Sequence, residues 1–273
     1  MKNIDFIFIG SAKAGSTWLY NFLMSHSSIF VPEAKDLYFF DRYYHLGVKW
    51  YQKQFISALR SQLKGEICHD YIVSNLAAER IYDHSPNTKI IVFYRKHADR
   101  SFSHYQYLHR SGQSFKSLSE AIKKEPAIID DSLVGKHLKK YTRLFPSNNI
   151  FVFNFDLLKS DPTHFAALFC KSLNIKLSNK SIHQSNWQRR SAQIPKSIAI
   201  AKLFKISANI FRFLGFARLV GKAKHNEFFM RFYKFDKNKK NNEDIKTLNT
   251  YEDLFESDKK DLLMMDVNFI GFK

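Results

Sequence analysis

The sequence predicts an α/β fold, a three-layer sandwich in which helices flank a central, mainly parallel sheet. Three observations support this prediction. Short apolar runs alternate with amphipathic helical patterns along residues 5–175. The run at residues 89–94 is almost wholly apolar, as expected of a buried parallel strand. A glycine-bounded loop separates the first apolar run, residues 6–9, from a helical pattern that begins near Ser16.

The size of the chain favours one domain. Its 273 residues, 45% of them hydrophobic, can bury a full core, so we expect a single domain over residues 1–273. Residues 1–175 are predicted to form the α/β core, and residues 176–273 a basic, mainly helical C-terminal extension. The first residues lack the apolar run of a signal peptide, and no run approaches the ~20 apolar residues of a membrane-spanning helix. We therefore expect a cytoplasmic protein, with Cys68 and Cys170 as buried structural thiols.

The loop at residues 10–17 is P-loop-like. Gly10 and Gly15 keep the glycine spacing of a Walker A loop, G-x-x-x-x-G-K-[ST], and the start of the helix that follows can bind an anion. Ser16 occupies the lysine position of that motif, however, and the lysine lies within the loop as Lys13. There it would lie nearer to a phosphate that leaves than to the terminal phosphates of a nucleoside triphosphate. The alternative is an ordinary strand–turn–helix corner with an incidental lysine.

One segment could supply a proton acceptor near this loop. Residues 33–41, after a short extended piece at residues 28–32, mix acids such as Asp36 with aromatic residues. A carboxylate held partly dry in such a segment can accept a proton. Residues 64–68 read as a second strand, and His69 follows it. The alternative is that the aromatic residues are core anchors and the acids are solvated, so composition alone selects no base.

The strand at residues 89–94 ends in Arg95. Because the carboxyl ends of strands line the ligand crevice of an open α/β sheet, Arg95 falls where the glycine loop also points. A helix predicted over residues 98–111 carries Ser103, and a guanidinium with a nearby hydroxyl suits a phosphate. The alternatives are a salt bridge from Arg95 to Asp99 and an exposed helix position for Ser103. An acid that could hold Mg²⁺ is missing at this strand end, so we expect no metal.

The α/β pattern continues to about residue 175 and then changes. Helices are predicted at residues 75–82, 117–124 and 132–144, a strand at residues 150–155, and another helix from Pro162. From Ile198 the pattern indicates a helix with a wide apolar face and a narrow basic stripe. It fits either a terminal helix docked on the core or a helix at a membrane surface.

The net charge of +18 is concentrated in one window. Residues 176–240 hold 16 Lys or Arg against two acids, a net charge of +14. Such a segment indicates an anionic partner: a phosphorylated cofactor, an acidic polymer or a membrane surface. The alternative is a solvated face that promotes solubility. The sequence has no zinc-finger spacing and no RRM signature, so we do not expect nucleic acid as a partner.

Together these motifs resemble the family of sulfotransferases that use 3′-phosphoadenosine 5′-phosphosulfate (PAPS), most closely its heparan-sulfate-type and bacterial carbohydrate branch. Residues 10–17 resemble the family's loop for the 5′-phosphosulfate, and residues 95–105 its 3′-phosphate motif. Residues 36–41 are similar to its acid-x-His-Phe-Phe-Asp element, and residues 46–51 to the segment after it. The resemblance covers residues 5–175.

The resemblance implies a role for each matching residue. Lys13 would stabilise the bridging oxygen as the phosphate leaves. Asp36 stands at the position of the family's catalytic glutamate and would deprotonate the acceptor, with His69 as the alternative base. Arg95 and Ser103 would hold the 3′-phosphate. The other residues that would contact the cofactor are Ser11, Ala12, Ala14, Gly15, Ser16, Thr17 and Trp18 at the 5′-phosphate, Gly135 at the adenine, and Arg189 or Arg190 closing on the 3′-phosphate.

The resemblance therefore predicts a sulfotransferase that moves a sulfuryl group from PAPS to a hydroxyl or amine by in-line displacement, leaving adenosine 3′,5′-bisphosphate (PAP). The expected partners are an acceptor glycan, a glycolipid or a small hydroxyl or amine compound, and an anionic membrane touched peripherally by the basic segment. Asp36 is one methylene shorter than glutamate, and Tyr38 and Ile67 stand where the family usually has histidine and lysine. Two alternatives stay open: a nucleoside-triphosphate-dependent P-loop kinase, and a non-catalytic binder of anionic polymers or membranes.

Overall fold

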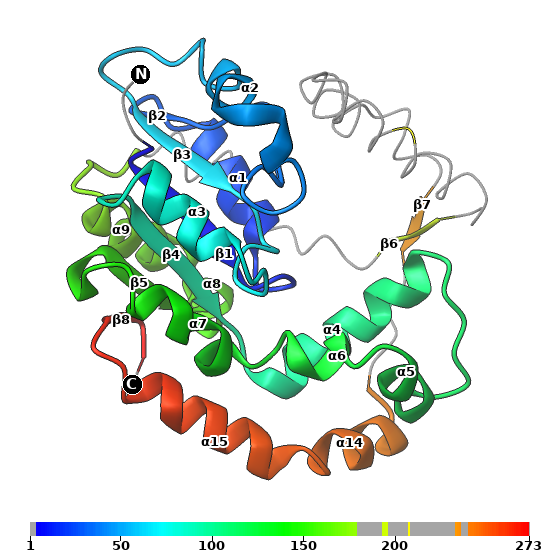
Figure 1. The fold of residues 1–273 in the computed structure, drawn as a ribbon. Helices are drawn as coiled ribbons and strands as arrows, with labels where there is room; N and C mark the ends of the chain where they lie inside the picture. The colour runs from blue at the N-terminus through cyan, green and yellow to red at the C-terminus, as the bar shows by residue number, and fades with distance from the viewer. Residues whose placement is uncertain (1–3, 179–192, 196–206, 208–232, 236–239, 273) are drawn as a thin grey trace.

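The computed structural model describes residues 4–178, 193–195, 207, 233–235 and 240–272. Its centre is a six-stranded sheet with the order β2-β3-β1-β4-β5-β8, in which every neighbouring pair is parallel (Figure 1). This confirms the α/β prediction. The strands are β1 (Phe6–Gly10), β2 (Ile29–Phe30), β3 (Leu63–Ile67), β4 (Lys89–Tyr94), β5 (Ile150–Asn154) and β8 (Asn268–Ile270).

Alternation along the strands divides the core between two faces of the sheet. In β1, Ile7 and Ile9 belong to one buried cluster and Phe6 and Phe8 to the other, because successive side chains of a strand point to opposite faces. All five residues of β1 are buried, as expected of a strand between two others. Since burying one large apolar side chain contributes about 1.5–3 kcal/mol, these two clusters are the main source of stability for the sheet.

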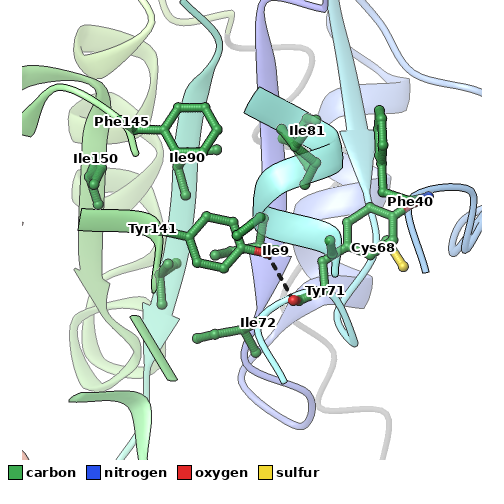
Figure 2. Packing of buried hydrophobic residues seen from close by; sticks show 14 of the residues in the cluster. Ile9, Phe40, Cys68, Tyr71, Ile72, Ile81, Ile90, Tyr141, Phe145 and Ile150 are labelled. Carbon is green, nitrogen blue, oxygen red and sulfur yellow. Dashed lines mark hydrogen bonds between the residues drawn. The ribbon is translucent and has the colours of Figure 1, made fainter. Parts of the chain in front are cut away.

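Helices α3 (Ala77–His84) and α7 (Val134–Thr142) cover the face on which Ile9 lies. Figure 2 shows Tyr141 of α7 among the isoleucines of the strands, with its hydroxyl donating to the main-chain oxygen of Tyr71 at 2.8 Å. The same cluster includes side chains from the connection between β2 and β3, which contains a 3₁₀ turn, Tyr44–Leu46, and helix α2 (Gly47–Lys53).

Helices α1 (Ser16–Met24), α8 (Phe155–Ser160) and α9 (Pro162–Ser172) cover the opposite face, where aromatic rings dominate. Phe8 and Phe93, on neighbouring strands, meet edge to face with their centroids 4.9 Å apart, an arrangement that aromatic pairs favour. Trp18, Leu19 and Phe22 of α1 belong to the same buried cluster, so the first helix is fixed to the sheet by its apolar face. Its N-terminus is held at the carboxyl end of β1.

A third buried cluster lies beyond the carboxyl end of β4, among short helices (Figure 1). It is built from apolar side chains of α4 (His97–Arg110), α5 (Leu118–Lys124), α6 (Ala127–Asp130), α14 (Asn242–Asn249) and α15 (Glu252–Leu263). Helix α4 follows β4 after two residues. Its packing in this cluster therefore fixes the direction of α4 at the carboxyl end of the sheet.

The C-terminal residues return to the core, which the sequence analysis did not foresee. Strand β8 pairs with β5 as an edge strand, and α15 packs on α7. The close approach requires Gly135, since a Cβ there would lie 2.4 Å from the main-chain oxygen of Asp258. The remaining described elements are a 3₁₀ turn, Ser147–Asn149, and an antiparallel pair of strands, β6 (Gln193–Pro195) and β7 (Tyr233–Phe235).

Most of the basic segment at residues 176–240, including the helix predicted from Ile198, lies outside the described residues. Where the structure does describe the chain, no helix is both long and apolar enough to cross a membrane.

Candidate functional site

The glycine loop (residues 10–17) and Arg95 lie at the carboxyl ends of neighbouring strands, because β1 pairs with β4. Gly15 is the N-cap residue of α1 and has φ 98°, a left-handed conformation that favours glycine. A Cβ on Gly15 would also lie 2.9 Å from Cδ2 of Leu158. Among the described residues, no side chain caps the start of α1, so the amides of its first turn form the kind of site that binds an anion.

Side-chain hydrogen bonds brace this loop. The hydroxyl of Ser11 donates to the main-chain oxygen of Phe93 at 2.8 Å. The guanidinium of Arg95 donates to the main-chain oxygen of Lys13 at 2.7 Å, and Nε of Arg100 donates to that of Ala12 at 3.2 Å. Two loop carbonyls, which would repel an anion, are thereby paired with cations.

Arg100 is a site residue that the sequence analysis missed. Its side chain is 1% exposed, and besides the loop it reaches the main-chain oxygens of Ala127 and Ile128, both at 3.3 Å, and the carboxylate of Asp131 at 3.2 Å. Such a buried cation is stable only because each contact is a paired hydrogen bond. Arg100 therefore fixes the loop to the helical cluster beyond the sheet.

One face of α4 points at the glycine loop. Arg100, Ser103 and Tyr107 follow the i, i+3, i+7 spacing that places residues on one side of a helix. Arg100 contacts the loop at Ala12, and the ring of Tyr107 lies 4.2 Å from the ammonium of Lys13. Ser103 lies between these two contacts, which fits its predicted place beside a phosphate.

The electrostatics around Lys13 favour an anionic ligand. Burial and, to a smaller extent, the charges of nearby cations together lower the pKa of Lys13 to about 7. These cations are, in order of effect, Arg110, Lys35, Arg100 and Arg95. A phosphate placed among them would offset this repulsion and favour the charged lysine. The side chains present therefore fit an anionic group such as a phosphate.

Both predicted bases, Asp36 and His69, lie together. Asp36 is 5% exposed, and its Oδ1 lies 2.7 Å from Nδ1 of His69. The same carboxylate lies 3.6 Å from the ammonium of Lys35, which donates to the hydroxyl of Ser16 at 2.9 Å. Lys35, a second residue that the sequence analysis did not single out, thus connects the candidate bases to the glycine loop.

A charged rim borders this pair. Nε2 of His69 lies 3.1 Å from the carboxylate of Asp70, and Asp70 pairs with Arg42 at 2.6 Å. The guanidinium of Arg42 lies over the ring of Tyr38 at 4.1 Å, and its side chain is 52% exposed. From buried Asp36 through His69 and Asp70 to exposed Arg42, a chain of polar contacts therefore leads from the loop to the surface.

Several residues predicted to contact the cofactor have other contacts in the structure. Ala14 and Trp18 are buried, and the indole of Trp18 stacks on Phe22 at 5.3 Å, so only their main chain could reach a ligand. Ser11 directs both its amide and its hydroxyl to Phe93. The amide of Gly135 donates to Asp258 at 3.0 Å. Arg189 and Arg190 lie outside the described residues, and the predicted contacts of all these residues stay predictions.

In the described part of the chain, no three His, Cys, Asp or Glu side chains gather as ligands of a metal ion would. Cys68 and Cys170 are both buried and unbridged, and burial raises the pKa of each thiol.

Known proteins are similar to this chain in sequence and in fold. Residues 3–258 match the family model described as the sulfotransferase domain. A stretch of 166 residues is 34% identical to heparan sulfate glucosamine 3-O-sulfotransferase 3B1 of Mus musculus, covering 57% of this chain and 42% of that protein. A stretch of 106 residues is 34% identical to the membrane-associated sulfotransferase kil1 of Dictyostelium discoideum, covering 38% and 22% of the two proteins. The chain thus spans less than half the length of these relatives.

Two solved structures are similar in fold. The sulfotransferase from Alicyclobacillus acidocaldarius superposes with a TM-score of 0.60 at 20% identity, over 81% of this chain and 96% of that one. A mouse sulfotransferase complexed with PAP superposes with a TM-score of 0.51 at 13% identity, over 95% and 90% of the two chains. At these identities the likeness concerns the fold.

Proposed function

Because the chain belongs to the sulfotransferase domain family, we propose that it transfers a sulfuryl group from PAPS to a hydroxyl or amine of an acceptor, a saccharide or a glycolipid. The observation that carries the proposal is the convergence of Arg95, Arg100, Arg110 and Lys35 on Lys13 at an uncapped helix start. One of the relatives named above is a heparan sulfate glucosamine 3-O-sulfotransferase, which supports a saccharide acceptor.

On the donor side, the chain would hold two anionic ends of one nucleotide. The amides of Gly15, Ser16 and Thr17 would bind the 5′-phosphate, and Arg95 and Ser103 the 3′-phosphate. Lys13 would stabilise the charge that grows on the leaving phosphate. At ~4 Å and an effective dielectric constant of about 20, that attraction is about 4 kcal/mol before desolvation. Even half of it corresponds to more than roughly tenfold in rate.

On the acceptor side, Asp36 and His69 would act as one unit. As the acceptor oxygen or nitrogen forms its bond to sulfur, the bond from sulfur to the phosphate oxygen breaks and the acceptor proton moves to this pair. Because the two groups lie 2.7 Å apart, the proton affinity that matters belongs to the pair. Lys35, in contact with Asp36 and Ser16, would hold the carboxylate beside the donor.

The test is incubation with radiolabelled PAPS and a panel of glycans, glycolipids, small alcohols and amines, with the Lys13→Ala variant as the matched control. We expect label on one acceptor class with the wild-type protein and little with the variant. Two outcomes would overturn the proposal. Tighter binding of ATP than of PAP, with no labelled acceptor, would favour a kinase. Sedimentation with anionic vesicles, without binding of PAP, would favour a non-catalytic binder.

Contact of the basic segment with an anionic membrane stays a prediction, since most of residues 176–240 lie outside the described residues. The net charge of +14 in residues 176–240 supports this prediction. The same charge would also favour an acidic saccharide chain, and the labelling panel distinguishes that role by its acceptor.

A further inference from the structure

Tyr107 lies where the donor side and the acceptor side of the proposed site meet. The ammonium of Lys13 lies over its ring, 4.2 Å from the centroid. Burial raises the pKa of its phenol, and the carboxylates of Asp70 and Asp36 raise it further, so the hydroxyl is within electrostatic reach of the candidate bases. Tyr107 is on α4, one turn beyond Ser103. None of the sequence motifs assigned it a role.

The ring is a neighbour of the Lys13 ammonium that attracts positive charge. The face of an aromatic ring is electronegative, and a cation over it is stabilised most when both are out of water. The cations that face Lys13 disfavour its charge instead: Arg95 after β4, Arg100 and Arg110 on α4, and Lys35 from the connection before β3. His104 of α4 also faces Lys13, but burial lowers the pKa of its imidazole to about 3, so the ring is neutral.

We propose that Tyr107 is a positioning residue, whose ring holds the Lys13 ammonium at the glycine loop so that the lysine is charged and in place when the phosphates of the donor arrive. The inference rests on the proposed function, because it concerns the lysine that would meet the leaving phosphate. It adds to the site a residue that lies one turn beyond Ser103 on α4.

The ring face is what the proposal requires, and the hydroxyl is dispensable. Phenylalanine presents the same face, whereas leucine fills similar space without it. Since the pKa of the Tyr107 phenol is raised, the phenol stays neutral over the pH range in which Lys13 titrates. A pH effect of substitution at Tyr107 would therefore come from Lys13. The Tyr107 side chain is 41% exposed, so its replacement removes little buried area.

The experiment compares Tyr107→Phe and Tyr107→Leu by calorimetric binding of PAP and by NMR titration of ¹⁵N-labelled lysine side chains. The Lys13 signal is assigned by its loss in Lys13→Ala. We expect Tyr107→Leu to lower the pKa of Lys13 by roughly 0.5–1 unit. PAP binding should weaken by about three- to tenfold at about pH 8.5, and by less at about pH 6.5, where a larger fraction of the lysine is charged in both proteins. Tyr107→Phe should match the wild type.

The matched control is Tyr82→Leu, which replaces a tyrosine of similar exposure, 37%, on α3. It should leave both readouts unchanged. An equal loss of binding at both pH values, or an unchanged Lys13 pKa in Tyr107→Leu, would overturn the inference. Failure of the wild-type protein to bind PAP at all would instead contradict the proposed function, so the two failures are distinguishable.

Discussion

The guanidinium of Arg95 donates a 2.7 Å hydrogen bond to the main-chain oxygen of Lys13. The residue predicted to hold the 3′-phosphate therefore touches the loop predicted to hold the 5′-phosphate. The two predicted ligand contacts therefore lie next to each other, as the binding of a single nucleotide with two anionic ends requires.

Arg95 can be tested for each of these two roles. If it binds the 3′-phosphate, Arg95→Gln should weaken PAP by about tenfold or more, and adenosine 5′-phosphate by clearly less, because a charge-assisted hydrogen bond is lost only with PAP. Calorimetric titration of both nucleotides measures this. Arg60→Gln, at an exposed arginine, is the matched control. Equal losses for both nucleotides would show that Arg95 only braces the loop.

The pH dependence of PAP binding should follow Lys13. Its pKa is lowered to about 7, first by burial and then by neighbouring cations, and a bound phosphate favours the charged form. Affinity should therefore be full below about pH 7 and fall above it, by up to about tenfold per pH unit. Titrations between about pH 7 and pH 9, where the phosphates stay ionised, test this. The decline should disappear in Lys13→Ala; a flat wild-type profile would refute the assignment.

The candidate base pair should control turnover and leave donor binding intact. With the acceptor identified by labelling, we expect Asp36→Asn and His69→Ala each to lower kcat by about a hundredfold or more, with the affinity for PAP little changed. Because the two groups act as a unit, the double variant should be little worse than the worse single one. Asp83→Asn, at an exposed aspartate of α3, is the control. Normal turnover of Asp36→Asn would remove the carboxylate from the mechanism.

Asp258 of α15 should be essential to stability. It is 6% exposed, lies 2.9 Å from Nε2 of His97, and accepts from the amides of Gly135 and Lys136 at 3.0 and 2.7 Å. Asp258→Ala leaves these buried groups unpaired, so we expect the free energy of unfolding to fall by about 3 kcal/mol.

The matched control for Asp258→Ala is Asp261→Ala, which removes an aspartate on the same helix whose ion pair with Lys139 is half exposed. Its effect should stay within about 0.5 kcal/mol. Denaturant unfolding of both variants measures the difference. Similar stability of the two variants would mean that the contacts of Asp258 with α4 and α7 contribute little.

The features that the sequence predicted are those encoded within about ten residues. The glycine loop between β1 and α1, and the arginine between β4 and α4, each follow from a local run of apolar residues and the polar residue that ends it. The predicted helix over residues 98–111 is confirmed as α4, His97–Arg110. Because strands of a parallel sheet end at the same edge, these local patterns also predicted that Lys13 and Arg95 would meet.

The features that the sequence did not predict depend on contacts between residues far apart in the chain. Arg100 reads from sequence as an exposed helix cation, since nothing local shows that its guanidinium would be enclosed by α6 and the loop. The i, i+3 spacing of Arg100 and Ser103 was the signal in the sequence that could have placed Arg100 at the site. Strand β8 is three residues long and pairs with β5 more than a hundred residues earlier, so no periodic pattern could reveal it.

The most direct test of the donor site is calorimetric titration of the wild-type protein with PAP and with ATP at about pH 7. If Lys13 and Arg95 hold the two phosphate-bearing ends of one nucleotide, PAP should bind one to one and at least about tenfold more tightly than ATP, which lacks the 3′-phosphate. Equal or tighter binding of ATP would contradict this account of the site.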